Sequence, residues 1–366
     1  MNPNKQIVVR WSLSMIPVYD NLHEQISRPL VLTDGIVGLD ESDLVKISFE
    51  GKIIWRCSHE WGFWGSPVKV DADRIVCASI NNQLHSIDRA GKIVRTTELP
   101  TSVSTEILVG EKGDLWFGIG AYECAVTRIC PNGSIIYTEY VARDKGLRQP
   151  LTWGVDGSLW AATDQSLARL DAQSGKILTW ISGEWDGFGC FSEAMPHADG
   201  ALVVAALPEQ QCAVVKVANN GKILAQYPLP NLLRARLVAN PTGGAWAIGS
   251  TVSPWEPVSD EDRTFVVRLT PDGKPEAVTE APARRFIEAT VNSDGTLWVG
   301  TYTRNNEDDS EIGELTAYKG AAIPSAKWIP TPPAGVGAPV LSPDGKGGVV
   351  ATSTALVGFT PTAPHG

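Results

Sequence analysis

Four ionisable side chains occupy equivalent places in four of the repeats of this 366-residue chain. Glu106, Glu193, Glu288 and the basic Arg236 each lie seven residues before the turn that opens a recurring apolar stretch. Carboxylate oxygens bind hard cations or amines, whereas a guanidinium group binds anionic or carbonyl groups. If the repeats surround one axis, these residues form either a water-facing ring of ion pairs or a binding site.

Aromatic and arginine side chains gather in segments expected at one mouth of the central channel around that axis. Two similar stretches, HEWGFWGS (59–66) and GEWDGFGCF (183–191), combine Glu-Trp with glycine and phenylalanine. Large aromatics in such loops either pack on one another between repeats or contact a partner. The predicted contact residues are Trp61, Phe63, Trp64, Trp185, Phe188, Phe191, Arg148, Arg234, Arg236 and Arg285. Of these, Arg148, Arg234 and Arg285 are expected to contact an anionic patch.

Repeated hairpins would position these residues. Stretches such as GDLWFGIG (113–120), GSLWAATD (157–164) and GTLWVGTY (295–302) form one half of the repeat, and stretches such as SGKILT (174–179) form the other. Turn glycines between short apolar runs indicate hairpins. The glycines of the second half recur every 40 to 52 residues, at positions 51, 91, 133, 175, 221 and 273. This period is typical of a β-propeller.

We therefore predict an all-β fold, a β-propeller of four-stranded antiparallel blades that forms one domain over residues 1–366. Residues 6–14 look like a lone fourth strand and residues 337–360 like the first three strands, so pairing the chain ends in one blade would close the ring. This arrangement predicts eight blades, with seven as the alternative. The other expected blades span 27–58, 64–97, 103–140, 149–181, 190–228, 234–279 and 285–329.

Composition narrows the classes of partner. The formal charge of −10 opposes binding to nucleic acids or anionic membranes. The N-terminal stretch lacks the apolar core of a signal peptide, so we expect a cytoplasmic protein, and we expect a monomer. The six cysteines show no CxxC spacing and the five histidines form no metal-binding motif, which predicts free thiols and no histidine-based metal site.

The DGxLWxGT and SGKIL patterns resemble the propeller repeats of bacterial two-component-regulator sensors, of the streptogramin lyase family and, more loosely, of quinoprotein-like propellers. The resemblance covers nearly the whole chain and implies the fold, because repeat motifs specify structure better than activity. This sequence lacks the paired histidines that a lyase would use and the adjacent cysteines that stack on a quinone. The SDGTLW run at 293–298 has the wrong spacing for a sialidase Asp-box.

Two functional hypotheses follow. The first is a non-catalytic module without a cofactor, which binds a protein partner through the aromatic and arginine-rich mouth. A bacterial immunity or adaptor protein would be one form of it. The alternative is a lyase or lactonase in which Glu106, Glu193 and Glu288 hold Mg²⁺ or Ca²⁺ and the metal polarises a substrate carbonyl.

Overall fold

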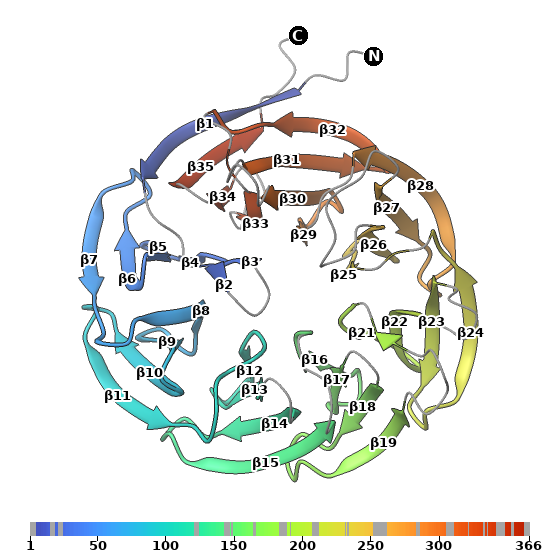
Figure 1. Ribbon diagram of the computed structural model, residues 1–366, viewed down its shortest axis with the longest axis horizontal. Helices are drawn as coiled ribbons and strands as arrows, with labels where there is room; N and C mark the ends of the chain where they lie inside the picture. The colour runs from blue at the N-terminus through green and yellow to red at the C-terminus, as the bar shows by residue number, and fades with distance from the viewer. Residues whose placement is uncertain are drawn as a thin grey trace.

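Antiparallel sheets follow one another around an axis in the computed structural model (Figure 1). The first and last described strands, β1 (Lys5–Ser14) and β35 (Ala355–Pro361), lie side by side (Figure 1). The described part of the chain contains no helix that could span a membrane. The structure describes residues 5–14, 19–20, 25–120, 124–142, 147, 149–163, 166–182, 189–190, 192–206, 212–230, 232, 234–251, 262–282, 286–304, 311–320, 322–331, 334, 336–341, 348–352 and 355–361.

Each of the first four blades is a separate four-stranded sheet whose strands pair in chain order. A short hairpin of β2 (Tyr19–Asp20) and β3 (Gln25–Ile26) precedes them and lies inside the ring (Figure 1). Blade 1 comprises β4 (Leu30–Leu32), β5 (Gly35–Asp40), β6 (Asp43–Ile47) and β7 (Ile53–Cys57); blade 2, β8 (Phe63–Lys69), β9 (Arg74–Ser79), β10 (Gln83–Asp88) and β11 (Ile93–Glu98); blade 3, β12 (Leu108–Val109), β13 (Leu115–Ile119), β14 (Cys124–Ile129) and β15 (Ile135–Ala142); and blade 4, β16 (Thr152–Trp153), β17 (Leu159–Ala162), β18 (Ser166–Leu170) and β19 (Ile177–Ser182).

The remaining four blades complete the ring, so the prediction of eight is confirmed. In blade 5 the innermost strand is split into two short pieces that both pair with β22. Blade 5 comprises β20 (Gly189–Cys190), β21 (Met195–His197), β22 (Gly200–Ala206), β23 (Cys212–Ala218) and β24 (Ile223–Pro228); blade 6, β25 (Arg234–Ala239), β26 (Ala245–Ser250), β27 (Arg263–Leu269) and β28 (Pro275–Pro282); blade 7, β29 (Phe286–Val291), β30 (Leu297–Arg304), β31 (Glu311–Lys319) and β32 (Ile323–Trp328); and blade 8, β33 (Val336–Leu341), β34 (Gly348–Thr352), β35 (Ala355–Pro361) and β1 (Lys5–Ser14).

The N-terminal strand closes the ring as predicted. β1 pairs antiparallel with β35, from Ile7 opposite Pro361 to Ser14 opposite Ala355. Its first two residues also pair in parallel with β32 of blade 7, which joins blades 7 and 8 into one sheet. Each chain end thus covers a strand that would otherwise be an open edge.

The turns between the third and fourth strands explain the SGKIL motif. In blade 4, Gly175 has a φ of +76°, and the register of β18 against β19 shifts by one residue between Arg169 and Leu170. A glycine with positive φ beside a one-residue bulge is the geometry of a tight hairpin turn. This geometry also lets the turn approach the preceding blade, because a Cβ on Gly175 would lie 2.6 Å from the Tyr137 ring.

Side chains of one blade bind the turn of the next. Arg169 Nη1 donates a hydrogen bond of 3.1 Å to the carbonyl of Asn219, and Thr179 Oγ1 donates to the same carbonyl at 2.7 Å. These contacts recur around the ring and hold adjacent blades at a fixed distance. The other donors and accepting carbonyls are Trp55 and Arg89, Arg95 and Pro131, Arg128 and Gln173, and Thr279 and Ala322.

Buried tryptophans on the second strands fill the seams between blades and account for the repeated Leu-Trp pair. They are Trp116, Trp160, Trp246 and Trp298, each at most 5% exposed. Because strands alternate in direction, the loops between blades lie on the same face as the loops between strands two and three. We call this the mouth face, and the opposite one, which carries the remaining turns, the turn face.

Candidate functional site

Ionisable side chains from five blades meet near the axis. Arg28, Glu106 and Glu193 each lie two residues before an inner strand, β4, β12 and β21 respectively. Arg236 and Glu288 lie on the inner strands β25 and β29. The inner strand of each blade lines the axis, so residues distant in sequence converge there. The predicted set of three glutamates and Arg236 is brought together, with Arg28 as an addition.

Two guanidinium groups connect the three carboxylates. Arg236 Nη2 pairs with Glu288 Oε1, and its Nη1 lies 3.7 Å from Glu193 Oε2. Arg28 Nη1 lies 3.9 Å from Glu106 Oε2, and its Nη2 lies 3.8 Å from Glu288 Oε2. Glu288 therefore bridges both arginines, and the network carries a formal charge of −1.

Burial and neighbouring charges shift the pKa values in this network. The positive charge of Arg28 lowers the pKa of Glu106 despite burial. Burial raises the pKa of Glu193, and the nearby Arg236 only partly offsets that effect. Burial works against the charged form of Arg236, but the carboxylates of Glu288, Glu193 and Glu106 outweigh it and raise its pKa. Arg236 therefore stays charged at any physiological pH.

These residues do not fit a Mg²⁺ or Ca²⁺ site. Within the described residues, no group of three or more His, Cys, Asp or Glu side chains is arranged to hold a metal ion. Each of the three glutamates faces Arg28 or Arg236, so the guanidinium groups supply the positive charge that a cation would supply. The geometry favours an ion-paired ring that fixes the inner strands.

The loop between blades 1 and 2 presents Trp61 on the mouth face. Its side chain is 55% exposed, while its backbone N–H donates to His59 Nδ1 at 3.3 Å. Gly62, with a φ of +72°, donates to the His59 carbonyl at 2.9 Å. A Cβ on Gly62 would lie 2.5 Å from Ser42 Cβ, which explains the glycine in Glu-Trp-Gly. The loop is therefore held by local contacts while the indole faces solvent.

Phe63 lies beneath this loop, and the expectation that it reaches the surface is wrong. Its side chain is fully buried in the core shared by blades 1 and 2. It packs edge-on against His85, and the His59 ring lies tilted against the same imidazole with its centroid 4.3 Å away. Phe63 anchors the loop because its ring packs against two others, those of His59 and His85. Trp64, the next residue, is half-buried.

His85 supports the loop from the neighbouring strand β10. It is fully buried, with Nε2 at 2.9 Å from Ser79 Oγ and Nδ1 at 3.0 Å from Thr96 Oγ1. Burial, assisted by nearby His59, lowers the pKa of His85 to about 4. The imidazole is therefore neutral at physiological pH, which suits its position in the apolar core.

Ile80 adds a second exposed apolar side chain beside Trp61. It lies in the turn between β9 and β10, is 54% exposed, and its N–H donates to the Gly62 carbonyl at 3.4 Å. Exposed Glu41 and Glu60 lie in the adjoining loops. We call Trp61 and Ile80 the Trp61–Ile80 patch. No repeat motif marks Ile80, so sequence comparison between blades did not reveal it.

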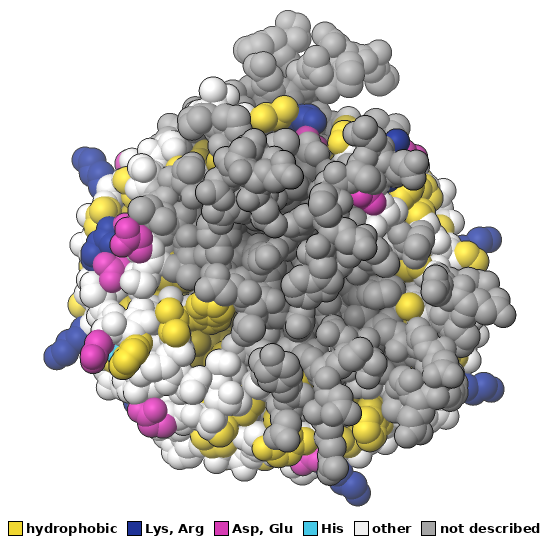
Figure 2. Space-filling model, viewed as in Figure 1, with side chains coloured by type: hydrophobic (Ala, Val, Ile, Leu, Met, Phe, Trp, Pro, Cys, Tyr) yellow, Lys and Arg dark blue, Asp and Glu magenta, His cyan; other side chains and the backbone are white. Residues whose placement is uncertain are grey.

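The other predicted mouth residues fall largely outside the described part of the chain. The structure describes Arg234 only as backbone at the start of β25. Lys and Arg side chains project outward from the described rim, and acidic and hydrophobic side chains are scattered among them (Figure 2). The predicted contact residues outside the described set are Arg148, Trp185, Phe188, Phe191 and Arg285.

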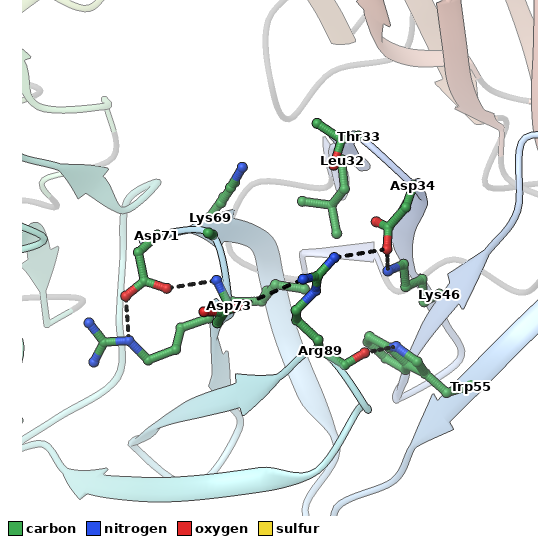
Figure 3. A pocket seen from close by; sticks show the side chains of 12 residues that line it. Leu32, Thr33, Asp34, Lys46, Trp55, Lys69, Asp71, Asp73 and Arg89 are labelled. Carbon is green, nitrogen blue, oxygen red and sulfur yellow. Dashed lines mark hydrogen bonds and ion pairs between the residues drawn. The ribbon is translucent and has the colours of Figure 1, made fainter.

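A small pocket on the turn face lies between blades 1 and 2 (Figure 3). Lys46 Nζ lies 2.8 Å from Asp34, and this hydrogen bond is the main cause of the lowered pKa of that aspartate. Arg89 crosses the pocket, 3.7 Å from Asp34 and 3.6 Å from Asp73 (Figure 3). Only the Arg89–Asp34 contact crosses between the two blades, because Lys46 belongs to blade 1 with Asp34 and Asp73 belongs to blade 2 with Arg89.

Comparison with known proteins shows the fold alone. No family model and no curated protein matches the sequence. Among solved structures, the chain is similar to BamB from Moraxella catarrhalis, with a TM-score of 0.68 and 12% sequence identity. The match covers 97% of this chain and 99% of the BamB chain. This likeness confirms the propeller resemblance deduced from the repeats, and it transfers no residue role at this level of identity.

Proposed function

We propose that this protein is a non-catalytic binding module that holds a protein partner through the Trp61–Ile80 patch. The observation that carries the proposal is the exposure of Trp61 on a loop whose backbone is fixed by His59, Gly62 and buried Phe63. A tryptophan already held in place loses little entropy on binding and offers a large apolar surface. Such residues commonly dominate protein interfaces.

The surroundings of the patch define the chemistry of the partner. Glu41 and Glu60 are exposed beside it, and the whole chain carries a formal charge of −10. An apolar centre with an acidic margin suits a partner surface that has an apolar pocket bordered by Lys and Arg side chains. The partner's basic margin would speed association, while Trp61 would contribute most of the affinity.

The finer parts of the proposal are a bacterial immunity or adaptor role and a cytoplasmic location. Both depend on what the partner is. A toxin or enzyme that loses activity when bound would support the immunity role. A component of a larger assembly would support the adaptor role.

Site-specific photo-crosslinking in the native cells tests the proposal. p-Benzoyl-phenylalanine replaces Trp61 in one variant, Ile80 in a second and Val155 in a third. Val155 is the matched control, because it is apolar and 71% exposed but lies in the turn between β16 and β17, on the turn face. We expect the same discrete adduct from positions 61 and 80 and none from position 155, with the captured protein identified by mass spectrometry.

The proposal is wrong if positions 61 and 80 give no adduct, or if position 155 captures the same protein equally well.

Titration calorimetry with Mg²⁺ and Ca²⁺ tests the alternative hypothesis of a metal-assisted lyase separately. Heat at micromolar metal that disappears in a Glu288→Gln variant would support that alternative. The absence of heat would agree with the paired guanidinium groups described above.

A further inference from the structure

The outermost strands of the blades differ in what they expose. β15 in blade 3 and β19 in blade 4 are sheet edges. The exposed side chains of β19 are Leu178, at 45%, and Trp180, at 55%, and those of β15 include Ile136 and Tyr140. Among the described side chains of these two strands, every exposed one is uncharged and none is proline.

The outer strands of five other blades are protected. Each exposes at least one charged or proline side chain, and such residues discourage pairing with another chain. Blades 3 and 4 are neighbours, so the unprotected edges form one sector of the rim. The protecting residues elsewhere include Arg56 on β7, Glu98 on β11, Pro228 on β24, Glu276 on β28 and Lys327 on β32.

This protein already adds an extra strand to one outer edge. Lys5 and Gln6 of β1 pair in parallel with Ala326 and Lys327 of β32, the outermost strand of blade 7. An extended segment can therefore lie along the outer edge of a blade in this ring. The same backbone groups of β19 have no neighbouring strand among the described residues.

The side chains of β19 define what a fifth strand would meet. Thr179 bonds to Asn219 and so faces blade 5, and alternation turns Leu178 and Trp180 to the opposite side. Lys176, just before the strand, is exposed. The edge thus offers two apolar contacts and a positive charge at one end.

We propose that β19 is a docking edge for an extended segment of a partner protein. The segment adds as a fifth strand to blade 4 through main-chain hydrogen bonds, and its alternate apolar side chains pack on Leu178 and Trp180. An acidic residue at one end of the segment lies beside Lys176. This site is separate from the Trp61–Ile80 patch and does not depend on it.

A designed peptide tests this edge on the full-length protein. The probe is a fluorescein-labelled DTVTVSVTD, in which valines alternate with polar residues and aspartates stand at both ends. Its control, DVVVTTSTD, has the same composition without the alternation. We expect fluorescence anisotropy to show micromolar binding of the first peptide only, and hydrogen exchange to show protection of amides in 177–182.

Three lysine variants locate the binding edge. Trp180→Lys and Leu178→Lys introduce the protection found on other blades and should each weaken binding roughly tenfold or more. Val94→Lys on β11 is the matched control and should leave binding unchanged, because that edge already exposes Glu98. Thermal unfolding confirms that each variant folds, and a Trp61→Ala variant should bind the peptide as well as the wild type does.

Several results would overturn the proposal. They are no binding to the wild type, equal binding of both peptides, undiminished binding by Trp180→Lys, or exchange protection on a strand other than β19. Sedimentation velocity tests whether a second copy of this chain, and not a partner protein, occupies the β19 edge. A wild-type dimer that becomes monomeric in Trp180→Lys would assign the edge to self-association and reject the partner segment.

Discussion

Arg236 on β25 and Glu288 on β29 form an ion pair across the seam between blades 6 and 7, with side chains only 12% and 8% exposed. Glu288 also faces Arg28 from blade 1, so one carboxylate connects residues of three blades. Nearly buried charges are stable only while they remain paired. The inner ring of this propeller therefore depends on side chains that the repeats bring together from distant positions.

Arg236→Met should lower the free energy of unfolding by about 3 kcal/mol, because it leaves Glu288 and Glu193 nearly buried without their main counter-charge. The midpoint of urea unfolding measures the loss. The double variant Arg236→Met with Glu288→Met should recover the part of the loss that comes from Glu288, while Glu193 still lacks Arg236.

Lys319→Met provides the control for that experiment. Its partner is Asp294 at 3.1 Å, and both side chains are more than half exposed. Surface pairs contribute about 0 to 1 kcal/mol, so the midpoint should hardly move. Equal effects of Lys319→Met and Arg236→Met would show that the axial network contributes no more than a surface pair.

Gly175→Ala should destabilise the protein more than Gly157→Ala does. Both glycines have a φ near +77°, at +76° and +78°, so alanine at either position costs about 1 kcal/mol of backbone strain. Only at Gly175 would the new Cβ lie 2.6 Å from the Tyr137 ring, whereas the space at Gly157 is open. The difference in melting temperature between the two variants measures the cost of the clash with Tyr137 at the contact between blades. Equal melting temperatures would refute a role for that contact.

The sequence predicted this architecture because the residues that define a blade recur. Turn glycines such as Gly175 and the buried tryptophans depend on local backbone geometry, so each repeat carries its own copy. The shared closing blade followed from two incomplete repeats at the chain ends. The sequence also predicted that Glu106, Glu193, Arg236 and Glu288 converge on the axis, because equivalent positions of equivalent strands must face it.

Features that break the repeat could not be predicted. Arg28 joins the axial network from a position before β4 that the comparison of repeats did not mark. Phe63 is buried by His59 and His85, a contact between segments that no spacing reveals. Ile80 belongs to a turn specific to blade 2. These residues acquire their roles from packing between segments and not from the motif.

Acid should weaken the fold through His85. Its pKa is about 4 when folded against 6.5 when unfolded, so the unfolded chain binds the proton more readily. Neutral His85 therefore contributes to the free energy of unfolding in full above pH 6.5. This contribution falls by about 3 kcal/mol in total as the pH drops to about 4. Urea unfolding of the wild type and of His85→Gln at several pH values measures it. If the unfolding free energies of the two proteins depend on pH in the same way from pH 6.5 to 4, this assignment is contradicted.

Reversing the acidic margin of the Trp61–Ile80 patch should slow association with the crosslinked partner. Glu41→Lys combined with Glu60→Lys places two positive charges where we expect basic partner residues, so electrostatic attraction becomes repulsion. Stopped-flow measurement at low ionic strength should show a clearly lower association rate constant, and 1 M salt should abolish most of the difference. A rate constant unaffected at low salt would remove the acidic margin from the binding surface.

Binding to the purified partner is the most direct test of the Trp61–Ile80 patch. Trp61→Ala should cost about 2 kcal/mol, a roughly 30-fold increase in Kd, because it deletes a preorganised apolar contact. Val155→Ser, on the turn face, should leave Kd unchanged, and both variants should melt at the wild-type temperature. A Kd for Trp61→Ala within twofold of the wild-type value would contradict the central role assigned to Trp61.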